Sequence, residues 1–259
     1  QLMQQSFVRE QEMIWGYSKS ILLTNIDYNG SAQPTIKDEP TEEKFYNYIR
    51  ELTMEGYYID IIILTHGSRY GINLKKSKNY HSGDEDAWFH DGLVTPRDLT
   101  NYFCPRFGYR KTPIRMVFQS NCWGSNMMQA WQDIGAKAVC GTRYVNYHAG
   151  TIIGFLPMWK DGQGFKKSVE TGVDLSNEGT YVVINTIAET QASKWRTNCK
   201  TTNIFKDKGG CVYKCYDKIY GHDKEQWFWD QTGRSNIDSS SKFFFLGDRN
   251  ITYQDKPTW

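Results

Sequence analysis

The chain has 259 residues, of which 39% are hydrophobic and 23% are charged, and its formal net charge is +2. The apolar content is sufficient for a folded core and excludes a disordered chain, while a length near the upper limit of a single core predicts one main domain. Basic and acidic residues are nearly balanced along the chain, so nucleic acids and anionic membranes are not expected as partners.

The first half of the chain alternates apolar strands with amphipathic helices. Ser20 to Ile26, Tyr57 to Thr65 and Ile114 to Phe118 are short and apolar, which predicts buried strands. Thr41 to Met54 opens with a capping Thr and two acidic residues, and its apolar residues share one helical face. Thr95 to Phe103, with Pro in its first turn, predicts a second helix.

The alternation continues to about residue 196. The patterns predict a helix, a strand, a helix interrupted around Gly162 and Gly164, and a longer amphipathic helix, at Ser125 to Ile134, Ala138 to Val145, Ile153 to Thr171 and Glu178 to Trp195. This order predicts an α/β fold, a three-layer sandwich with a mostly parallel central sheet and helices on both faces. Its functional loops should gather at the carboxyl ends of the strands.

From residue 197 onward the chain is rich in Lys, Gly, Tyr and Trp. Short β-like segments occur at Gly210 to Tyr216, Glu225 to Trp229 and Lys242 to Tyr253. We therefore expect residues 1–196 to form the α/β core, and residues 197–259 to form a small β-rich C-terminal extension packed on it.

A histidine and a cysteine follow two of the predicted strands. His66 and Gly67 come directly after the strand that ends at Thr65, and Cys122 follows the strand Ile114 to Phe118. Because the carboxyl ends of parallel strands meet at one edge of a sheet, these residues are expected to lie close together. An imidazole can take the proton of a thiol and return it to a leaving amine. The pair is typical of a cysteine nucleophile with an acid/base partner.

The N–H groups of Gly67 and Cys122 could form an oxyanion hole, because a glycine lets the backbone approach a substrate. An isolated cysteine is more often a buried, inert residue, and a turn histidine is more often bonded to backbone, but the strand-end positions favour the catalytic interpretation. The remaining histidines lack this setting and are interpreted as surface residues: His81, His90, His148 and His222.

The segments around these residues resemble the signatures of clan CD cysteine peptidases, which include caspases, gingipains, clostripain and legumain. ILTHGS at 63–68 is similar to their His-Gly motif, and VFQSNCWGS at 117–125 is similar to their Gln-x-Cys-x-Gly motif, with Gln119 one position further from the cysteine than in caspases. Weaker likenesses to the gingipain and clostripain branch are DGLVTPRDL, FLPMWKDGQGFKKSVETG and FFFLGDRNITY. The resemblance implies a caspase-like fold, with Cys122 as nucleophile and His66 as its acid/base partner.

The resemblance also nominates residues for the S1 pocket, which holds the substrate side chain before the scissile bond. The matching positions are Asp27, Ser120 and Arg143. Asp27 would pair with Arg or Lys, as the likeness to gingipains implies, whereas Arg143 would favour an acidic substrate residue. The alternative for Asp27 is a turn acid that caps its own backbone, and for Arg143 a solvated charge at a strand end.

The proposed chemistry needs no cofactor. An acidic loop follows His66 and could hold calcium, but its spacing matches no EF-hand and favours a solvated loop; its residues are Asp84, Glu85, Asp86 and Asp91, with His81 and His90 nearby. Another group could supply zinc ligands, but its spacing matches no common zinc pattern; its residues are Cys199, Cys211, Cys215 and His222.

Six cysteines are too few for a disulfide scaffold, which favours a reducing, cytoplasmic compartment, with a secreted protein holding one bridge as the alternative. The longest apolar run, Tyr57 to Leu64, is too short to cross a bilayer, so no membrane-spanning segment is expected. Since the chain begins at Gln1 and not at Met, we expect an upstream segment, such as a regulatory domain or an activator, in the full protein.

Two functions from different classes are compatible with this sequence. The first is an endopeptidase that cleaves protein or peptide substrates through a thioester acyl-enzyme, after a basic residue. The second is a catalytically silent or latent caspase-like module that regulates or binds another protein. A nucleotide-binding protein is disfavoured, because neither G-x-G-x-x-G nor a P-loop follows the first predicted strand.

Overall fold

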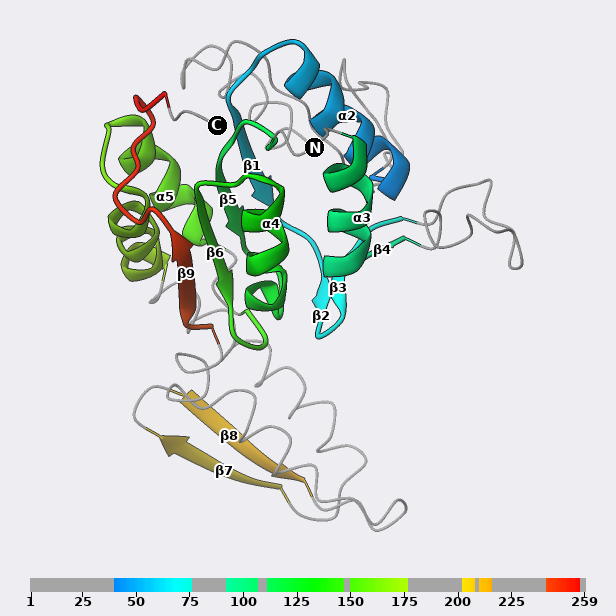
Figure 1. Cartoon of the computed structure of the whole chain (residues 1–259). Helices are drawn as coiled ribbons and strands as arrows, with labels where there is room; N and C mark the ends of the chain where they lie inside the picture. The colour runs from blue at the N-terminus through cyan, green and yellow to red at the C-terminus, as the bar shows by residue number, and fades with distance from the viewer. Residues whose placement is uncertain are drawn as a thin grey trace, which may run out of the picture.

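The computed structural model describes residues 40–75, 92–106, 111–146, 150–176, 202–207, 210–215 and 241–256 (Figure 1). A four-stranded sheet forms its centre, with strand order β1-β5-β6-β9. The strands are β1 (Ile59–Ile63), β5 (Ile114–Gln119), β6 (Ala138–Thr142) and β9 (Phe243–Gly247). The first three are parallel, and β9 runs antiparallel to β6. The predicted α/β class with a mostly parallel sheet is therefore confirmed.

The burial of the strands explains their sequences. Every residue of β5 and β6 is buried, whereas alternate residues of β1 are buried. Strands covered on both faces need apolar residues at every position, which is why β5 shows no polar alternation before Gln119. Two apolar clusters lie on opposite faces of the sheet, one centred on Trp131 and the other on Phe155.

Three helices and a 3₁₀ turn contribute to the cluster around Trp131: α2 (Glu42–Met54), α3 (Pro96–Arg106), η3 (Gly124–Met127) and α4 (Met128–Ile134). Thr41 caps α2 as predicted, since its side chain accepts a hydrogen bond from Lys44 N. The helix predicted from Ser125 begins instead as the 3₁₀ turn η3, and α4 starts directly after it at Met128.

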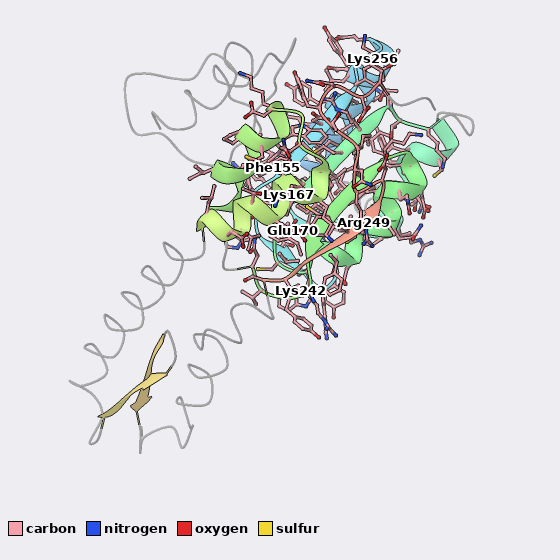
Figure 2. The ribbon with its side chains drawn as sticks, turned by 90° about the vertical axis from the view of Figure 1, so that its left-hand side faces the viewer. Phe155, Lys167, Glu170, Lys242, Arg249 and Lys256 are labelled. Atoms are coloured by element: carbon pink, nitrogen blue, oxygen red, sulfur yellow. The ribbon has the colours of Figure 1, made fainter. Side chains whose placement is uncertain are left out.

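The opposite face is covered by α5 (Thr151–Lys160) and by a second helix at 165–176 (Figure 2). The predicted interruption is confirmed, because Gly162 lies between the helices with φ +78°, a conformation that favours glycine. Phe155 stacks on Phe118 of β5 with ring centroids 4.7 Å apart, while Lys167 and Glu170 are exposed. Helices on both faces give the described part three layers.

The C-terminal strand corrects the predicted extension. The sequence placed 242–253 in an appendage, but β9 pairs with β6 from Ala138–Gly247 to Thr142–Phe243 and is part of the central sheet. The partner of a strand depends on contacts distant in sequence, which local composition does not reveal. The strand predicted at Gly210 to Tyr216 is present as β8 (Gly210–Cys215), paired with β7 (Thr202–Asp207).

Three predicted elements lie outside the described residues, namely Ser20 to Ile26, Glu178 to Trp195 and Glu225 to Trp229. Within the described ranges, no helix combines the length and the apolar character needed to cross a membrane.

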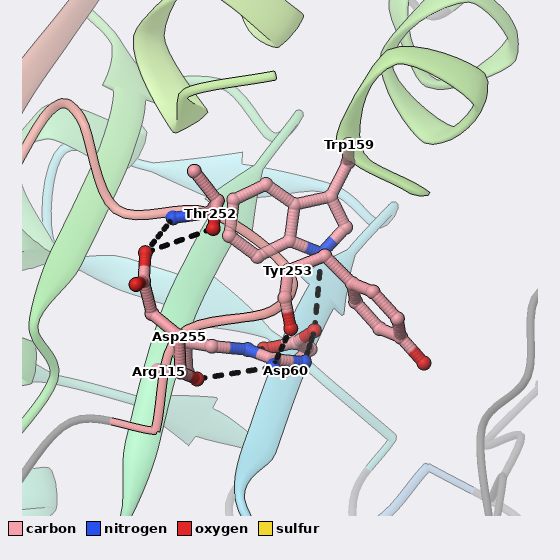
Figure 3. Close-up of polar contacts among 6 residues, drawn as sticks. All are labelled: Asp60, Arg115, Trp159, Thr252, Tyr253 and Asp255. Carbon is pink, nitrogen blue, oxygen red and sulfur yellow. Dashed lines mark hydrogen bonds and ion pairs between the residues drawn. The ribbon is translucent and has the colours of Figure 1, made fainter. Parts of the chain in front are cut away.

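A buried ion pair joins the neighbouring strands β1 and β5 near their amino ends (Figure 3). The guanidinium of Arg115 donates to both carboxylate oxygens of Asp60, at 2.8 and 2.5 Å, and Trp159 of α5 donates its indole N–H to Asp60 at 3.1 Å. Arg115 also donates to the backbone oxygen of Tyr253, and its guanidinium lies 4.7 Å from that ring centroid. The pair therefore attaches α5 and the segment after β9 to the sheet.

Candidate active site

The carboxyl ends of β1 and β5 are held together directly before the predicted dyad. Ile63 and Gln119 are register partners, and the next amide, Ser120 N, donates to the oxygen of Ile63 at 2.9 Å. His66 and Cys122 follow these two partners at equal distances along the chain. The structure thus brings both predicted residues to the same edge of the sheet.

Gly67 fixes the contact between the two loops. A Cβ atom at Gly67 would lie 2.2 Å from the backbone oxygen of Cys122 and 2.4 Å from Nδ2 of Asn121, whereas real Cβ contacts below 3.0 Å essentially never occur. The sequence suggested that Gly67 lets a substrate approach. The structure adds that only glycine lets the histidine loop reach the cysteine loop.

A small antiparallel sheet that the sequence did not predict orients Gly67. Its strands are β2 (Gly67–Ser68), β3 (Gly71–Asn73) and β4 (Leu93–Val94), in that order. Asn73 N donates to the oxygen of His66, so these two residues form the hydrogen-bonded pair and the next pair, Gly67 and Ile72, is a non-bonded one. The N–H of Gly67 therefore points away from β3, toward the open edge of this sheet.

The turn that carries Cys122 has an unusual backbone. Trp123 has φ 54° and ψ 24°, and within the described ranges it is the one non-glycine residue with a positive φ. Such strain at a non-glycine residue is most common at functional sites. A hydrogen bond from Trp123 N to the oxygen of Tyr144, at 2.7 Å, holds the turn against the loop after β6.

Gln119 supports this turn from inside the core. Its Nε2 donates to the backbone oxygens of Gly124 and Cys140, at 3.1 and 3.3 Å, and its Oε1 accepts from the indole N–H of Trp131 at 3.1 Å. The side chain is fully buried. Both the nitrogen and the oxygen of the Gln119 amide are therefore hydrogen-bonded within the protein core.

Asn121 is a site residue that sequence reasoning missed. It is 1% exposed, its Nδ2 donates to the backbone oxygen of Cys122 at 3.1 Å, and its backbone oxygen accepts from the Thr142 hydroxyl at 2.8 Å. Its position directly before Cys122 was the available signal. The side chain lies against Gly67 and Cys122 together, so it helps to set the spacing of the two loops.

The predicted S1 residues have different settings. Ser120 accepts hydrogen bonds from Asn146 Nδ2 through both its backbone oxygen and its hydroxyl, at 2.9 and 2.7 Å. Arg143 is exposed, and its guanidinium lies 5.1 Å from the centroid of the Tyr144 ring. Asp27 lies outside the described residues. The loop after β6 thus contacts the cysteine loop, but the described residues do not test the preferred substrate residue.

The side chains of the predicted dyad differ in exposure. Cys122 is partly buried and His66 is exposed, and neither the thiol nor the imidazole is hydrogen-bonded to a described residue. Cys140 contrasts with this, since complete burial in β6 raises the pKa of its thiol. A thiol that resists ionisation is a poor nucleophile, so Cys140 is interpreted as a core residue.

The predicted metal candidates are not tested. The acidic loop from Asp84 to Asp91, with His81 and His90, lies outside the described residues, as do Cys199 and His222, and only the backbone of Cys211 and Cys215 is described. Among the residues with described side chains, no group of three His, Cys, Asp or Glu could hold a metal ion.

Comparison of the chain with protein-family models and with curated protein sequences finds no match.

Proposed function

We propose that this protein is a cysteine endopeptidase with a caspase-like catalytic core. The observation that carries the proposal is the contact between Gly67 and the Cys122 backbone, which joins the His66 loop to the cysteine loop at the carboxyl edge of the sheet. The proposal also rests on the resemblance of the two motifs to clan CD peptidases and on the strained backbone of Trp123.

In the proposed reaction, His66 takes the proton of the Cys122 thiol, and the sulfur attacks the carbonyl carbon of the scissile peptide bond. The N–H groups of Gly67 and Cys122 stabilise the resulting oxyanion. The carbon–nitrogen bond then breaks, and His66 gives its proton to the leaving amine. Water, deprotonated by His66, next attacks the thioester and releases the acid product, and the proton returns to the sulfur.

The Gly67 N–H suits this role, because β-sheet register turns it away from β3 and leaves it outside the ladder. The Cys122 N–H likewise has no acceptor among the described residues. The proposed substrate residue before the scissile bond is Arg or Lys, through Asp27. A positional-scanning peptide library tests that preference, and a preference for Asp or Glu would transfer the S1 role to Arg143.

The test of the proposed function compares two cysteine variants. Cys122→Ala should abolish cleavage of a fluorogenic peptide library and labelling by a peptidyl acyloxymethyl ketone. Cys104→Ala should change neither, because Cys104 is an exposed thiol on α3, outside the site. Unfolding curves establish that both variants fold. Labelling and cleavage that persist in Cys122→Ala would reject the assignment, and an unmodified native chain would favour the silent regulatory module.

A further inference from the structure

Arg69 lies on the β2–β3 turn, next to the proposed dyad. The turn links Ser68 to Gly71, which are register partners, and Tyr70 N donates to the Ser68 hydroxyl at 3.2 Å. Asn126 of η3 donates its Nδ2 to the backbone oxygen of Arg69 at 2.9 Å. Because η3 belongs to the turn that follows Cys122, this bond fixes Arg69 relative to the proposed nucleophile.

The side chain of Arg69 is exposed and contacts Tyr70. Its Nη2 donates to the Tyr70 hydroxyl at 2.5 Å, and its guanidinium lies 4.8 Å from the centroid of that ring. No carboxylate among the described residues forms an ion pair with it. A stacked guanidinium loses less freedom on binding a carboxylate, and it can donate two parallel hydrogen bonds to it.

The position of Arg69 relative to the proposed acid, His66, indicates which side of the scissile bond Arg69 would contact. The acid that protonates the leaving amine must lie on the leaving-group side of the scissile bond. His66 directly precedes β2, and Arg69 directly follows it on the same hairpin. Arg143 follows β6, on the other side of the Cys122 strand in the order β1-β5-β6. Arg69 therefore belongs to the leaving-group side and Arg143 to the acyl side.

We propose that Arg69 and Tyr70 form a recognition site for an acidic substrate residue within the first few positions after the scissile bond. This inference rests on the proposed peptidase function. The substrate class that fits this site is a peptide with Asp or Glu on its leaving-group side. This preference is independent of the residue that occupies the S1 pocket.

The test uses internally quenched peptides that share one acyl side and carry Glu, Gln or Lys at a single position after the scissile bond. Wild-type chain should cleave the best Glu peptide about three- to tenfold faster than its Gln partner, as measured by kcat/KM. Arg69→Gln should remove this preference, and Arg69→Glu should favour the Lys peptide. The preference should weaken as the salt concentration rises, because the pair is exposed.

Arg249→Gln is the matched control. Arg249 is also an exposed arginine, but it follows β9 beyond the pairing of Gly247 with Ala138, so it lies at the amino edge of the parallel strands and away from the site. Figure 2 shows it at the opposite end of β9 from Lys242. The Glu preference should persist in this variant. An equal loss in both arginine variants would indicate a general charge effect and overturn the proposal, as would cleavage without any Glu preference.

A binding measurement separates this inference from the peptidase proposal. Fluorescence anisotropy with Cys122→Ala compares peptides that carry Glu or Gln on the leaving-group side, so no turnover is needed. Tighter binding of the Glu peptide, lost in Cys122→Ala/Arg69→Gln, supports the site even if the wild-type chain cleaves nothing. Equal binding of the two peptides by both variants overturns the inference, whatever the result of the cleavage assay.

Discussion

Gly67 lies so close to Cys122 that a methyl group on its α-carbon would be 2.2 Å from the Cys122 carbonyl oxygen. That oxygen is backbone, so it cannot rotate away as a flexible side chain would. The close approach joins the loop after β1 to the loop after β5. The spacing of the proposed dyad therefore depends on the absence of a Cβ atom at Gly67.

Gly67→Ala should therefore displace the cysteine turn. We expect a loss of about 1–3 kcal/mol in the free energy of unfolding and a fall of about 100-fold in the labelling rate of Cys122. Gly150→Ala is the control, because among the described residues the added Cβ would meet Ser176 alone, at 3.4 Å, and the φ of Gly150 is −74°. Urea unfolding and timed labelling measure both effects. Unchanged labelling of Gly67→Ala would show that the contact is not needed.

The strain at Trp123 predicts an order of stability between two variants. A left-handed φ destabilises a folded non-glycine residue by about 1–2 kcal/mol, and glycine avoids this cost. Glycine also gives the unfolded chain more freedom, which offsets about 0.4–1 kcal/mol of that advantage. Trp123→Gly should thus be about 0.5–1 kcal/mol more stable than Trp123→Ala, since both lose the indole and only glycine relieves φ 54°. Thermal unfolding compares them. The reverse order would mean that the turn relaxes in the variants.

Gln119→Leu should destabilise the fold through its amide contacts. The substitution leaves the Trp131 indole N–H without its acceptor and removes a donor from the Gly124 and Cys140 oxygens. A buried group that loses its partner costs about 1–3 kcal/mol, so we expect a total above about 2 kcal/mol. Gln129→Leu, at an exposed residue of α4, should change stability by less than about 0.5 kcal/mol. Similar losses in both variants would contradict the structural role of Gln119.

The ion pair between Asp60 and Arg115 should show strong coupling. Their side chains are 1% and 8% exposed, so removing either partner leaves a charge in a nearly dry site and should cost about 3–5 kcal/mol. Asp60→Asn, Arg115→Met and the double variant form a cycle, and the double variant should lose less than the sum of the single ones. A parallel cycle on Lys166 and Glu170, an exposed pair, should give less than about 0.5 kcal/mol. Additive losses at the buried pair would refute the coupling.

Asp255 gives a pH-dependent contribution to stability. The amide and the hydroxyl of Thr252 donate to its carboxylate at 2.6 and 2.9 Å, and these bonds lower the pKa of Asp255. The folded state therefore binds fewer protons than the unfolded state near this carboxyl's ordinary range, about pH 4. The contribution is complete above that range and is lost as the pH falls through the lowered folded pKa.

Asp255→Asn should flatten this part of the acid dependence. Urea unfolding of wild type and variant between about pH 2.5 and pH 6 measures it, because the other carboxyl groups are common to both chains. The stability difference between them should grow from pH 3 to pH 5 and then stay constant. A difference that does not change with pH would exclude the linkage.

The sequence determined the elements that depend on neighbouring residues. The capping residue and apolar face of α2, the buried runs of β1 and β5, and the break at Gly162 are all encoded within short windows. Because parallel strands place their carboxyl ends together, the positions of His66 and Cys122 after such runs were sufficient to predict that their loops meet.

The tertiary structure decided what depends on distant partners. The sequence could not show that β9 completes the sheet, that Asn121 bonds to Cys122, or that Arg69 is tied to η3, because each contact joins groups whose positions are set by backbone register and packing. The clearest case is Gly67. Its residue type was visible in the sequence, but the reason that only glycine fits, a backbone oxygen of another loop at 2.2 Å from the missing Cβ, exists only after the sheet has brought the two loops together.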